Sequence, residues 1–358
     1  MFTYLKEGLL VAKKNFRRKA YQEYKGNSKE ICQQIVKDCY NGKFLQTSAG
    51  HFSSFWIRDF GICVEALVKM GYRKEARKTL KYALDVYSTH NKITTTISHH
   101  NVPFNVFTIS PDSLPFLIRS LVITNSRDLI KKYKKFLETQ IKQYSEEVVE
   151  KDTGLVKKRF FSSMKDNSQR KSSCYDNSMV GMLSNDLNRL KLKNPFKSYN
   201  YNKLLIDNFW NGKYFNDDLE TDYVAGDANV FPFWCGVIKD KGMFKKTLKS
   251  IKKHKLDKPF PLKYTVTKRH RFNGILNLII NNYQGNTIWM NIGLCFLDVV
   301  KKYDKKQADI YINQYDKLIK KHKNFLELYS SHGKPYNSWL YKSDEKIIWA
   351  AKYVVLAK

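Results

Sequence analysis

Apolar residues recur at helical spacing along almost the entire chain. A period of 3.6 residues, with polar positions between the apolar ones, is typical of helices that bury one face. Few runs of strictly alternating apolar and polar residues compete with this pattern. It predicts an all-α protein with helices near residues 29–41, 59–70, 74–87, 112–123, 127–148, 175–190, 200–210, 228–239, 243–253, 287–303, 306–323 and 344–357.

The helical segments come in pairs of different character. Short turns such as Gly71-Tyr72 and Asn125-Ser126 join neighbouring segments, which predicts successive αα-hairpins. Within a pair, one segment is apolar and rich in small residues, as in 60–70, and the next carries many lysines. Inner helices surrounded by amphipathic outer helices have this composition, so we predict one domain over residues 1–358 with an (α/α)6 toroid architecture. An open α-solenoid is the alternative, but solenoids usually show a repeat of roughly 30 to 45 residues, which this sequence lacks.

Longer polar segments interrupt the helical pattern six times. Each is rich in aromatic residues, Gly, Asn and carboxylates, and each precedes an expected inner helix, so all should emerge at the same end of the barrel. Aromatic faces stack on sugar rings, and Asp, Arg and Asn bind hydroxyl groups. These segments, which predict a carbohydrate-binding cleft, are 42–57, 88–111, 150–174, 211–227, 254–286 and 324–343.

The chain carries a large excess of positive charge. Its 358 residues include 64 Lys and Arg against 33 Asp and Glu, a formal net charge of +31. Such a balance is typical of proteins that bind nucleic acid or anionic membranes. The lysines are nevertheless spread in pairs inside helical segments, for example Lys131-Lys132 and Lys252-Lys253. We therefore expect solvated outer helix faces, with polyanion binding as the less favoured alternative.

The six cysteines are scattered, and none forms a CxxC pair or a Cys/His cluster with the spacing of metal ligands. We expect no metal site. Cys39, Cys63, Cys235 and Cys295 lie in apolar helical contexts, as buried free thiols do. Together with the lack of a signal-peptide pattern and of an N-terminal apolar run long enough to span a bilayer, this predicts a cytoplasmic protein that does not enter membranes.

The sequence around the first expected inner helix carries a recognisable motif. Trp56, Arg58 and Asp59 lie where a polar segment enters an apolar helix, and Gly71-Tyr72 with Ala76 follow that helix. This arrangement resembles the opening of the glucoamylase-type six-hairpin glycosidases, a clan that includes neutral invertases and glycogen-debranching glucosidases. The resemblance implies that Arg58 and Asp59 bind sugar hydroxyls and that Trp56 forms an apolar wall. An Arg58–Asp59 ion pair beside a core Trp is the alternative.

Three further segments resemble the same clan, in the same order along the chain. Gly226-Asp227-Ala228-Asn229 is similar to a turn that begins an inner helix, and Asp227 would bind substrate. Tyr283-Gln284-Gly285-Asn286-Thr287-Ile288-Trp289 is similar to an element whose Trp lines the cleft; Trp339 is a further candidate for such a wall. Phe325-Leu326-Glu327-Leu328-Tyr329 is similar to the segment that supplies the catalytic base, here Glu327, and Glu345 would be a helix N-terminal residue.

The general acid is the weak point of this resemblance. Glucoamylases use a Glu at a position that corresponds here to Lys157, after Gly154. Asp176 is the nearby replacement, since Cys174-Tyr175-Asp176-Asn177-Ser178 resembles the V-D-S or R-D-S element of neutral invertases and debranching glucosidases. A helix N-cap is the alternative role for Asp176. The reserve carboxylates are Asp152, Asp166, Glu220 and Asp222, and the loop histidines His99 and His100 are weaker candidates for binding hydroxyls.

The resemblance implies an inverting, exo-acting glycoside hydrolase that needs no cofactor. Its substrate would be an α-linked oligosaccharide or polysaccharide from which it releases glucose, as glucan 1,4-α-glucosidases and amylo-α-1,6-glucosidases do. Inversion requires an acid that protonates the leaving oxygen and a base that deprotonates water. We assign these roles to Asp176 and Glu327. The alternatives are a toroid that binds carbohydrate but has lost catalysis, suggested by Lys157, and a basic scaffold that binds polyanions.

Overall fold

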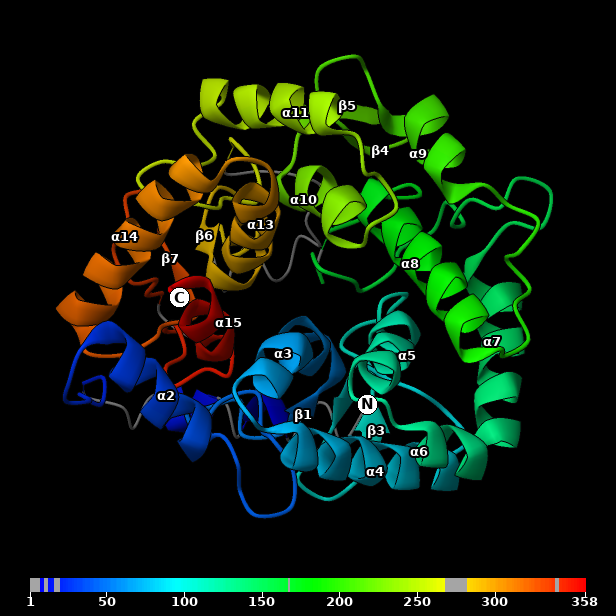
Figure 1. The fold of residues 1–358 in the computed structure, drawn as a ribbon, viewed down its shortest axis with the longest axis horizontal. Coiled ribbons are helices and arrows are strands. Elements are labelled where there is room, and N and C mark those ends of the chain that lie inside the picture. Colours follow the sequence, from blue (N-terminus) through cyan, green and yellow to red (C-terminus); the bar gives the residue numbers. More distant parts are fainter. Residues whose placement is uncertain (1–6, 10–11, 16–19, 167, 268–281, 339–340) are drawn as a thin grey trace.

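The helices form two concentric rings (Figure 1). The computed structural model describes residues 7–9, 12–15, 20–166, 168–267, 282–338 and 341–358. The inner ring consists of α3 (Ile57–Lys69), α5 (Ser113–Ile123), α8 (Cys174–Leu190), α10 (Gly226–Trp234), α13 (Met290–Tyr303) and α15 (Ala350–Leu356). The outer ring consists of α2 (Ser28–Asp38), α4 (Arg73–Thr89), α6 (Arg127–Lys132), α7 (Lys134–Val148), α9 (Tyr201–Phe209), α11 (Lys241–Lys253) and α14 (Lys305–His322).

The inner ring is closed. Each inner helix packs against the next one in chain order, from α3 to α15, and α15 packs back against α3. The outer helix α2 contacts both α14 and α15, so the beginning and the end of the described barrel meet (Figure 1). The predicted (α/α)6 toroid is confirmed, and the open solenoid is excluded because its ends would not touch.

The inner helices are buried on more sides than the outer helices, as the sequence predicts. Almost every residue of α8 is buried, which is expected for a helix that is surrounded by other helices. In α11, by contrast, Phe244, Leu248 and Ile251 are buried on one face while the lysines are exposed. At Gly61 in α3, an added Cβ atom would lie 2.5 Å from the ring of Phe116 in α5. Only Gly allows these two inner helices to approach so closely.

Three small antiparallel sheets lie in the segments that precede inner helices. They are β1 (Phe55–Trp56), β2 (Thr96–Ile97) and β3 (Pro103–Phe104), then β4 (Asn216–Asp218) with β5 (Thr221–Val224), and finally β6 (Ile288–Trp289) with β7 (Leu328–Tyr329). None of these strands was predicted, because two to four residues are too few to show a period. They join long loops to one another at the end of the barrel where the inner helices begin.

Some helix boundaries differ from the predicted ones. The segment 127–148 is divided at Tyr133, and the segment 228–239 is helical only to Trp234. In the second case Pro232 removes one backbone donor, and Gly236 has a φ of +72°, which ends the helix. The final inner helix begins at Ala350 rather than near residue 344. Glu345 is therefore not a helix N-terminal residue; its carboxylate accepts hydrogen bonds from the Gln22 backbone N–H and the Asn324 side chain.

All six cysteines are buried free thiols, including Cys32 and Cys174 as well as the four that the sequence marks as buried. Among the described residues, no group of three or more His, Cys, Asp and Glu side chains is placed to hold a metal ion. No helix in the described part of the chain combines the length and apolar character needed to cross a bilayer.

Candidate active site

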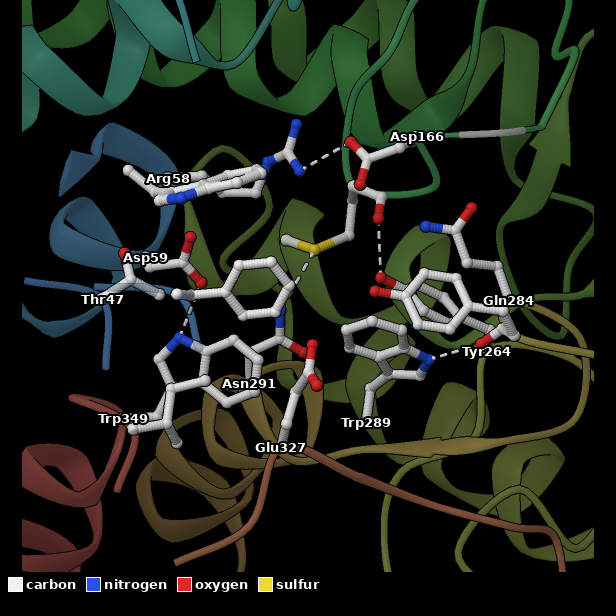
Figure 2. Close-up of a pocket in the computed structure, with 15 residues that line it drawn as sticks. Thr47, Arg58, Asp59, Asp166, Tyr264, Gln284, Trp289, Asn291, Glu327 and Trp349 are labelled. Carbon is white, nitrogen blue, oxygen red and sulfur yellow. Dashed lines mark hydrogen bonds and ion pairs between the residues drawn. The ribbon is translucent and has the colours of Figure 1, made fainter. Parts of the chain in front are cut away.

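A pocket opens at the end of the barrel where α3, α13 and α15 begin (Figure 2). It encloses about 500 Å³, its opening to solvent included. Its lining consists of six aromatic residues (Phe52, Trp56, Tyr264, Tyr283, Trp289, Trp349), three carboxylates (Asp59, Asp166, Glu327) and Thr47, Arg58, Met164, Gln284, Asn291 and Ile347. Helix N-termini carry partial positive charge, which favours an acidic side chain such as Asp59 in the first turn of α3.

The aromatic residues form a connected wall. The rings of Tyr283 and Trp289 meet edge to face at 4.9 Å, and those of Tyr264 and Trp289 at 5.5 Å. The Trp289 ring N–H donates to the backbone carbonyl of Tyr283 at 3.0 Å, and the Tyr264 hydroxyl donates to that of Met164 at 2.7 Å. Since their polar atoms are bonded within the protein, these rings are fixed and their faces remain for a ligand.

Arg58, in the first turn of α3, fixes one side of the pocket. Its Nε donates to Asp112 at 2.6 Å and its Nη1 to Asp166 at 2.9 Å. The Asp166 side chain is 20% exposed, so a ligand can reach it, whereas the Asp112 side chain is fully buried. Burial raises the pKa of Asp166 although Arg58 opposes this shift. The result is a carboxyl group that is held in position and is more easily protonated than usual.

Asp59 follows Arg58 in the same turn, and its side chain also faces the pocket (Figure 2). Its Oδ1 accepts a hydrogen bond from the ring N–H of Trp349 at 2.9 Å. Burial raises the pKa of Asp59 to about 7, against the opposing effects of Arg58 and Trp349. The alternative, an Arg58–Asp59 ion pair, is not found among the contacts of the described residues, because the Arg58 guanidinium bonds to Asp112 and Asp166 instead.

Glu327 lies on another side of the pocket, immediately before β7. Trp289 pairs with Leu328 across the β6–β7 sheet, and the Met290 N–H donates to the Glu327 carbonyl at 3.1 Å. The Glu327 Oε2 accepts hydrogen bonds from the Tyr341 hydroxyl at 2.5 Å and from the Asp344 backbone N–H at 3.0 Å. Burial, followed by the charge of Asp344, raises the pKa of Glu327 to about 8.

Comparison by sequence and comparison by structure give different results for this chain. No family model matches the sequence. No curated protein matches it either. Solved structures do match: a GH63 mannosylglycerate hydrolase from Thermus thermophilus in complex with Tris has a TM-score of 0.67 at 11% identity, covering 92% of this chain and 99% of that one.

Two longer proteins contain a similar barrel. A bacterial glucoamylase in complex with acarbose has a TM-score of 0.66 at 15% identity, covering 92% of this chain and 55% of the other. A rhamnosidase from Klebsiella oxytoca with rhamnose bound has a TM-score of 0.66 at 8% identity, covering 91% of this chain and 62% of the other. The chain has the six-hairpin glycosidase fold. This chain spans less than two thirds of the rhamnosidase and glucoamylase chains.

Within the six-hairpin fold, Asp176 does not line the pocket. It lies in the first turn of α8, where Ser173 accepts from its backbone N–H at 3.0 Å and donates to its Oδ2 at 2.6 Å. Burial raises the pKa of Asp176 to about 6. Asp176 follows the N-cap residue Ser173 in the first turn of α8, whereas Asp166 is the carboxyl that this loop presents to the pocket. The role of Asp176 as the general acid stays a prediction.

Asp227 is also outside the pocket and is fully buried. Arg170 donates to its Oδ2 at 2.7 Å, and the Lys165 ammonium lies 3.5 Å from its Oδ1. The same two cations contact Asp217 at 3.1 and 3.2 Å. In this structure the Asp227 carboxylate contacts the two cations of a buried network, and its binding of substrate stays a prediction. Lys165 of this network adjoins Asp166, so the cluster holds the loop that carries that carboxyl.

Replacing Asp227 with Ala should lower the free energy of unfolding by about 3–5 kcal/mol, because Arg170 and Lys165 would lose one of their two buried counter-ions. Urea unfolding measures this change. A matched control is Glu65→Ala, which removes an exposed ion pair to Lys69 and should cost about 0.5 kcal/mol or less. Equal effects of the two substitutions would show that the buried cluster adds nothing to stability.

The other residues that the sequence suggests as site residues do not line the pocket, except that Trp339 cannot be placed. Asp152, Glu220 and Asp222 are exposed and do not line it. His99 is exposed and contacts Glu7 at 3.0 Å, and His100 is exposed beside it. Trp339 lies outside the described residues. The Lys157 ammonium donates to the Glu146 carbonyl at 2.7 Å, so this position points toward α7.

Sequence reasoning missed several pocket residues. Tyr283, Gln284 and Trp349 lie inside segments that resemble the clan, so their motifs were a usable signal. Tyr264 and Met164 carried no comparable signal, because each is an isolated residue within a long polar segment. Trp56, Arg58, Asp59, Trp289 and Glu327 line the pocket as the resemblance implies.

Proposed function

We propose that this protein is an inverting, exo-acting glycoside hydrolase with Asp166 as general acid and Glu327 as general base. The observation that carries this proposal is the placement of these two carboxyl groups on different sides of one aromatic pocket (Figure 2). A pair of carboxyl groups that flanks the scissile bond is the arrangement glycosidic hydrolysis requires. The glycosidase names of the structural neighbours support the same reaction class.

The chemistry follows from the environment of each group. Protonated Asp166 donates its proton to the glycosidic oxygen as the bond to the anomeric carbon breaks, so the leaving sugar departs as a neutral alcohol. Ionised Glu327 takes a proton from a water molecule whose oxygen attacks the anomeric carbon from the opposite face. The products are two sugars with free hydroxyls, and the anomeric configuration is inverted. Asp59 and Arg58 would hold hydroxyls of the sugar being released, between the aromatic walls.

An α-linked glucosyl unit at the nonreducing end is the substrate we propose. A pocket lined on several sides by aromatic residues and carboxyl groups favours one terminal sugar over the middle of a long chain. The motifs that resemble glucoamylases point to glucose. Related folds have been solved with acarbose, with glucose and with rhamnose bound, so other terminal sugars belong in the test.

The assay is incubation of the purified protein with maltooligosaccharides, isomaltose, trehalose, sucrose, mannosylglycerate and an aryl rhamnoside, followed by proton NMR. Release of β-glucose from an α-linked substrate is the expected result, because inversion converts the α-anomer into the β-anomer. Release of α-glucose first would contradict inversion. If only mannosylglycerate or only the rhamnoside were hydrolysed, the hydrolase proposal would stand, but the released sugar would be mannose or rhamnose and not glucose.

The pH dependence of kcat/KM should be bell-shaped. Glu327 must be ionised, and burial raises its pKa to about 8, so activity should fall as the pH drops through about 8. Asp166 must be protonated, and because burial raises its pKa, the alkaline limb should lie at higher pH than an ordinary aspartate would give. Initial rates at low substrate concentration measure the profile. Its two apparent pKa values describe Glu327 and Asp166 together and not either residue alone. Full activity at pH 4 would contradict this expectation.

The alternative of a sugar-binding toroid without catalysis loses its main support. It rests on Lys157 replacing the catalytic acid, but the Lys157 side chain bonds to Glu146 outside the pocket. Asp166 supplies a carboxyl group in the pocket instead. Sugar-dependent chemical shift changes without any turnover, in the NMR assay above, would favour the alternative.

A further inference from the structure

Arg58 is held by a second carboxylate, Asp112, which does not line the pocket. The Asp112 Oδ2 accepts from the Arg58 Nε at 2.6 Å, and the Asp112 Oδ1 accepts from the Arg58 Nη2 at 3.4 Å. The Asp112 side chain is fully buried, whereas that of Asp166, the other partner of Arg58, is 20% exposed. One guanidinium group thus joins a carboxylate in the protein interior to a carboxyl group in the pocket.

The ordinary role of an aspartate at a helix start does not explain Asp112. It is the N-cap residue of α5, where an Asp side chain usually accepts a hydrogen bond from the first helical turn. In the described structure its carboxylate makes no such capping bond. It accepts instead from the Tyr175 hydroxyl at 2.7 Å and from the Ser110 hydroxyl at 2.6 Å, in addition to Arg58. The Asp112 carboxylate therefore faces Arg58 and does not cap the helix.

Asp112 and Asp166 compete for a single positive charge. Both Asp112 oxygens accept from Arg58, which stays protonated and always donates, so Asp112 is the ionised partner of this pair. Asp166 accepts from Arg58 only through Nη1, at 2.9 Å. Because Asp112 already compensates the charge of Arg58, this arginine stabilises an ionised Asp166 less than a free guanidinium group would. The buried carboxylate thus favours the protonated form of the carboxyl group in the pocket.

Other ionisable groups also adjoin Asp166 or act on it, namely a carboxyl group, two phenols and an ammonium group: Asp59, Tyr264, Tyr283 and Lys165. The carboxyl group repels an ionised Asp166 as Asp112 does. Burial raises the pKa of both phenols, so they stay neutral. The ammonium group contacts the buried network described above. Burial is the first cause of the raised pKa of Asp166, Arg58 opposes it, and the charge of Asp112 adds to it.

We propose that Asp112 is a positioning residue that shares Arg58 with Asp166 and thereby keeps the proton of the general acid on Asp166. The proposal rests on the proposed function for its catalytic meaning, but the coupling between the two carboxyl groups can be measured without any turnover. Asp112→Asn removes the charge and leaves an amide oxygen that can still accept from the Arg58 Nε. Arg58 then keeps Asp166 as its remaining counter-ion, so Asp166 should lose its proton more easily.

The first experiment is a ¹³C NMR titration of the aspartate carboxyl groups, with the Asp166 signal assigned by its absence in Asp166→Asn. In the wild type, the pKa of Asp166 should lie above 3.8, the ordinary value of aspartate. In Asp112→Asn it should be lower by about one pH unit, which is a tenfold change in proton affinity. Equal Asp166 titrations in the two proteins would overturn the proposal, and so would a wild-type Asp166 that titrates at or below 3.8.

Asp186→Asn is the matched control, because Asp186 is also a fully buried partner of an arginine, Arg119, at 2.5 Å, and neither residue lines the pocket. It should leave the Asp166 titration unchanged; an equal shift there would mark a general effect of losing a buried charge and reject the proposal. Tyr175→Phe removes a donor from Asp112 but no charge, so the pKa of Asp166 should stay or rise. If Asp112→Asn fails to fold, a lowered Asp166 pKa in Tyr175→Phe would still contradict the proposal.

The second experiment measures kcat/KM on a hydrolysed glycoside and on the α-glycosyl fluoride of the same sugar at each pH. Fluoride leaves without a proton, whereas both substrates need the water that Glu327 activates, so the ratio of the two values reports the protonation of Asp166. The ratio should fall as the pH rises through the pKa of Asp166. In Asp112→Asn the fall should occur about one pH unit lower, giving a ratio about tenfold below wild type at higher pH and convergence at lower pH. A ratio reduced equally at every pH would mark a merely structural role and overturn the proposal.

The two experiments separate this proposal from the proposed function. Absence of turnover in every protein, with the Asp166 pKa lowered in Asp112→Asn, would reject the hydrolase proposal and leave the coupling of the two carboxyl groups standing. Turnover with equal Asp166 titrations in wild type and Asp112→Asn would leave the hydrolase proposal standing and reject the role of Asp112.

Discussion

Glu327→Gln is expected to lower kcat/KM by about 10²- to 10⁴-fold on every hydrolysed substrate, because the amide cannot take a proton from the attacking water. The substitution preserves size, and its side-chain oxygen can still accept from Tyr341. Initial-rate assays of purified wild type and variant measure the effect. A variant with more than a tenth of wild-type activity would remove Glu327 from the base role.

Stability provides the control for this substitution. The pKa of Glu327 is raised in the folded protein, from 4.5 to about 8, so the folded state binds the proton more tightly than the unfolded state does. Wild-type stability should therefore fall as the pH rises through this range, and Gln, which does not ionise, escapes that loss. Thermal unfolding should show Glu327→Gln at least as stable as wild type above pH 8. Lost activity in that variant then reflects chemistry and not unfolding.

Asp166→Asn is expected to lower kcat/KM about 10²- to 10⁴-fold on natural glycosides but much less on α-glucosyl fluoride. Fluoride leaves without a proton, so the missing acid matters little for that substrate. The ratio of rates on maltose and α-glucosyl fluoride measures this selectivity. Glu327→Gln should lose activity on both substrates, since each needs an activated water.

Asp176→Asn is the matched comparison for Asp166→Asn, because both residues are aspartates of the same segment before or at the start of α8. We expect Asp176→Asn to retain activity within tenfold of wild type, since its carboxylate accepts from the hydroxyl of the N-cap residue Ser173 and does not line the pocket. If Asp176→Asn showed the fluoride-selective loss and Asp166→Asn did not, the two assignments would have to be exchanged.

The helical architecture was predictable because each helix produces a hydrophobic pattern in its own segment of the sequence. The inner segment 113–123 is buried along most of its length and is mainly apolar, while α11 shows a regular stripe. These are local properties, so a single sequence contains them. Two-residue strands such as β6 and β7 depend on pairing with a distant segment, and no local pattern records it.

The choice between Asp166 and Asp176 could not be made from the sequence for the same reason. Arg58 and Asp166 are 108 residues apart and meet only in the folded chain. Asp227 appeared functional because its motif resembles a cleft element, but the cations that occupy it, Lys165 and Arg170, come from another loop. Glu327 could be predicted as a pocket residue because the residues on both sides of it carry the resemblance.

Closure of the helix ring also dictates when the pocket can form. Asp59 and Trp349, which are joined by a hydrogen bond, are 290 residues apart, and α15 completes the ring beside α3. During synthesis the earlier helices form an open arc whose apolar inner faces lack their last neighbour, a state prone to aggregation. Contacts of such long sequence separation slow folding, because the connecting chain must be ordered first. A ribosome-bound chain therefore gains its binding site only after α15 emerges, so chaperone demand should persist until that helix has been synthesised.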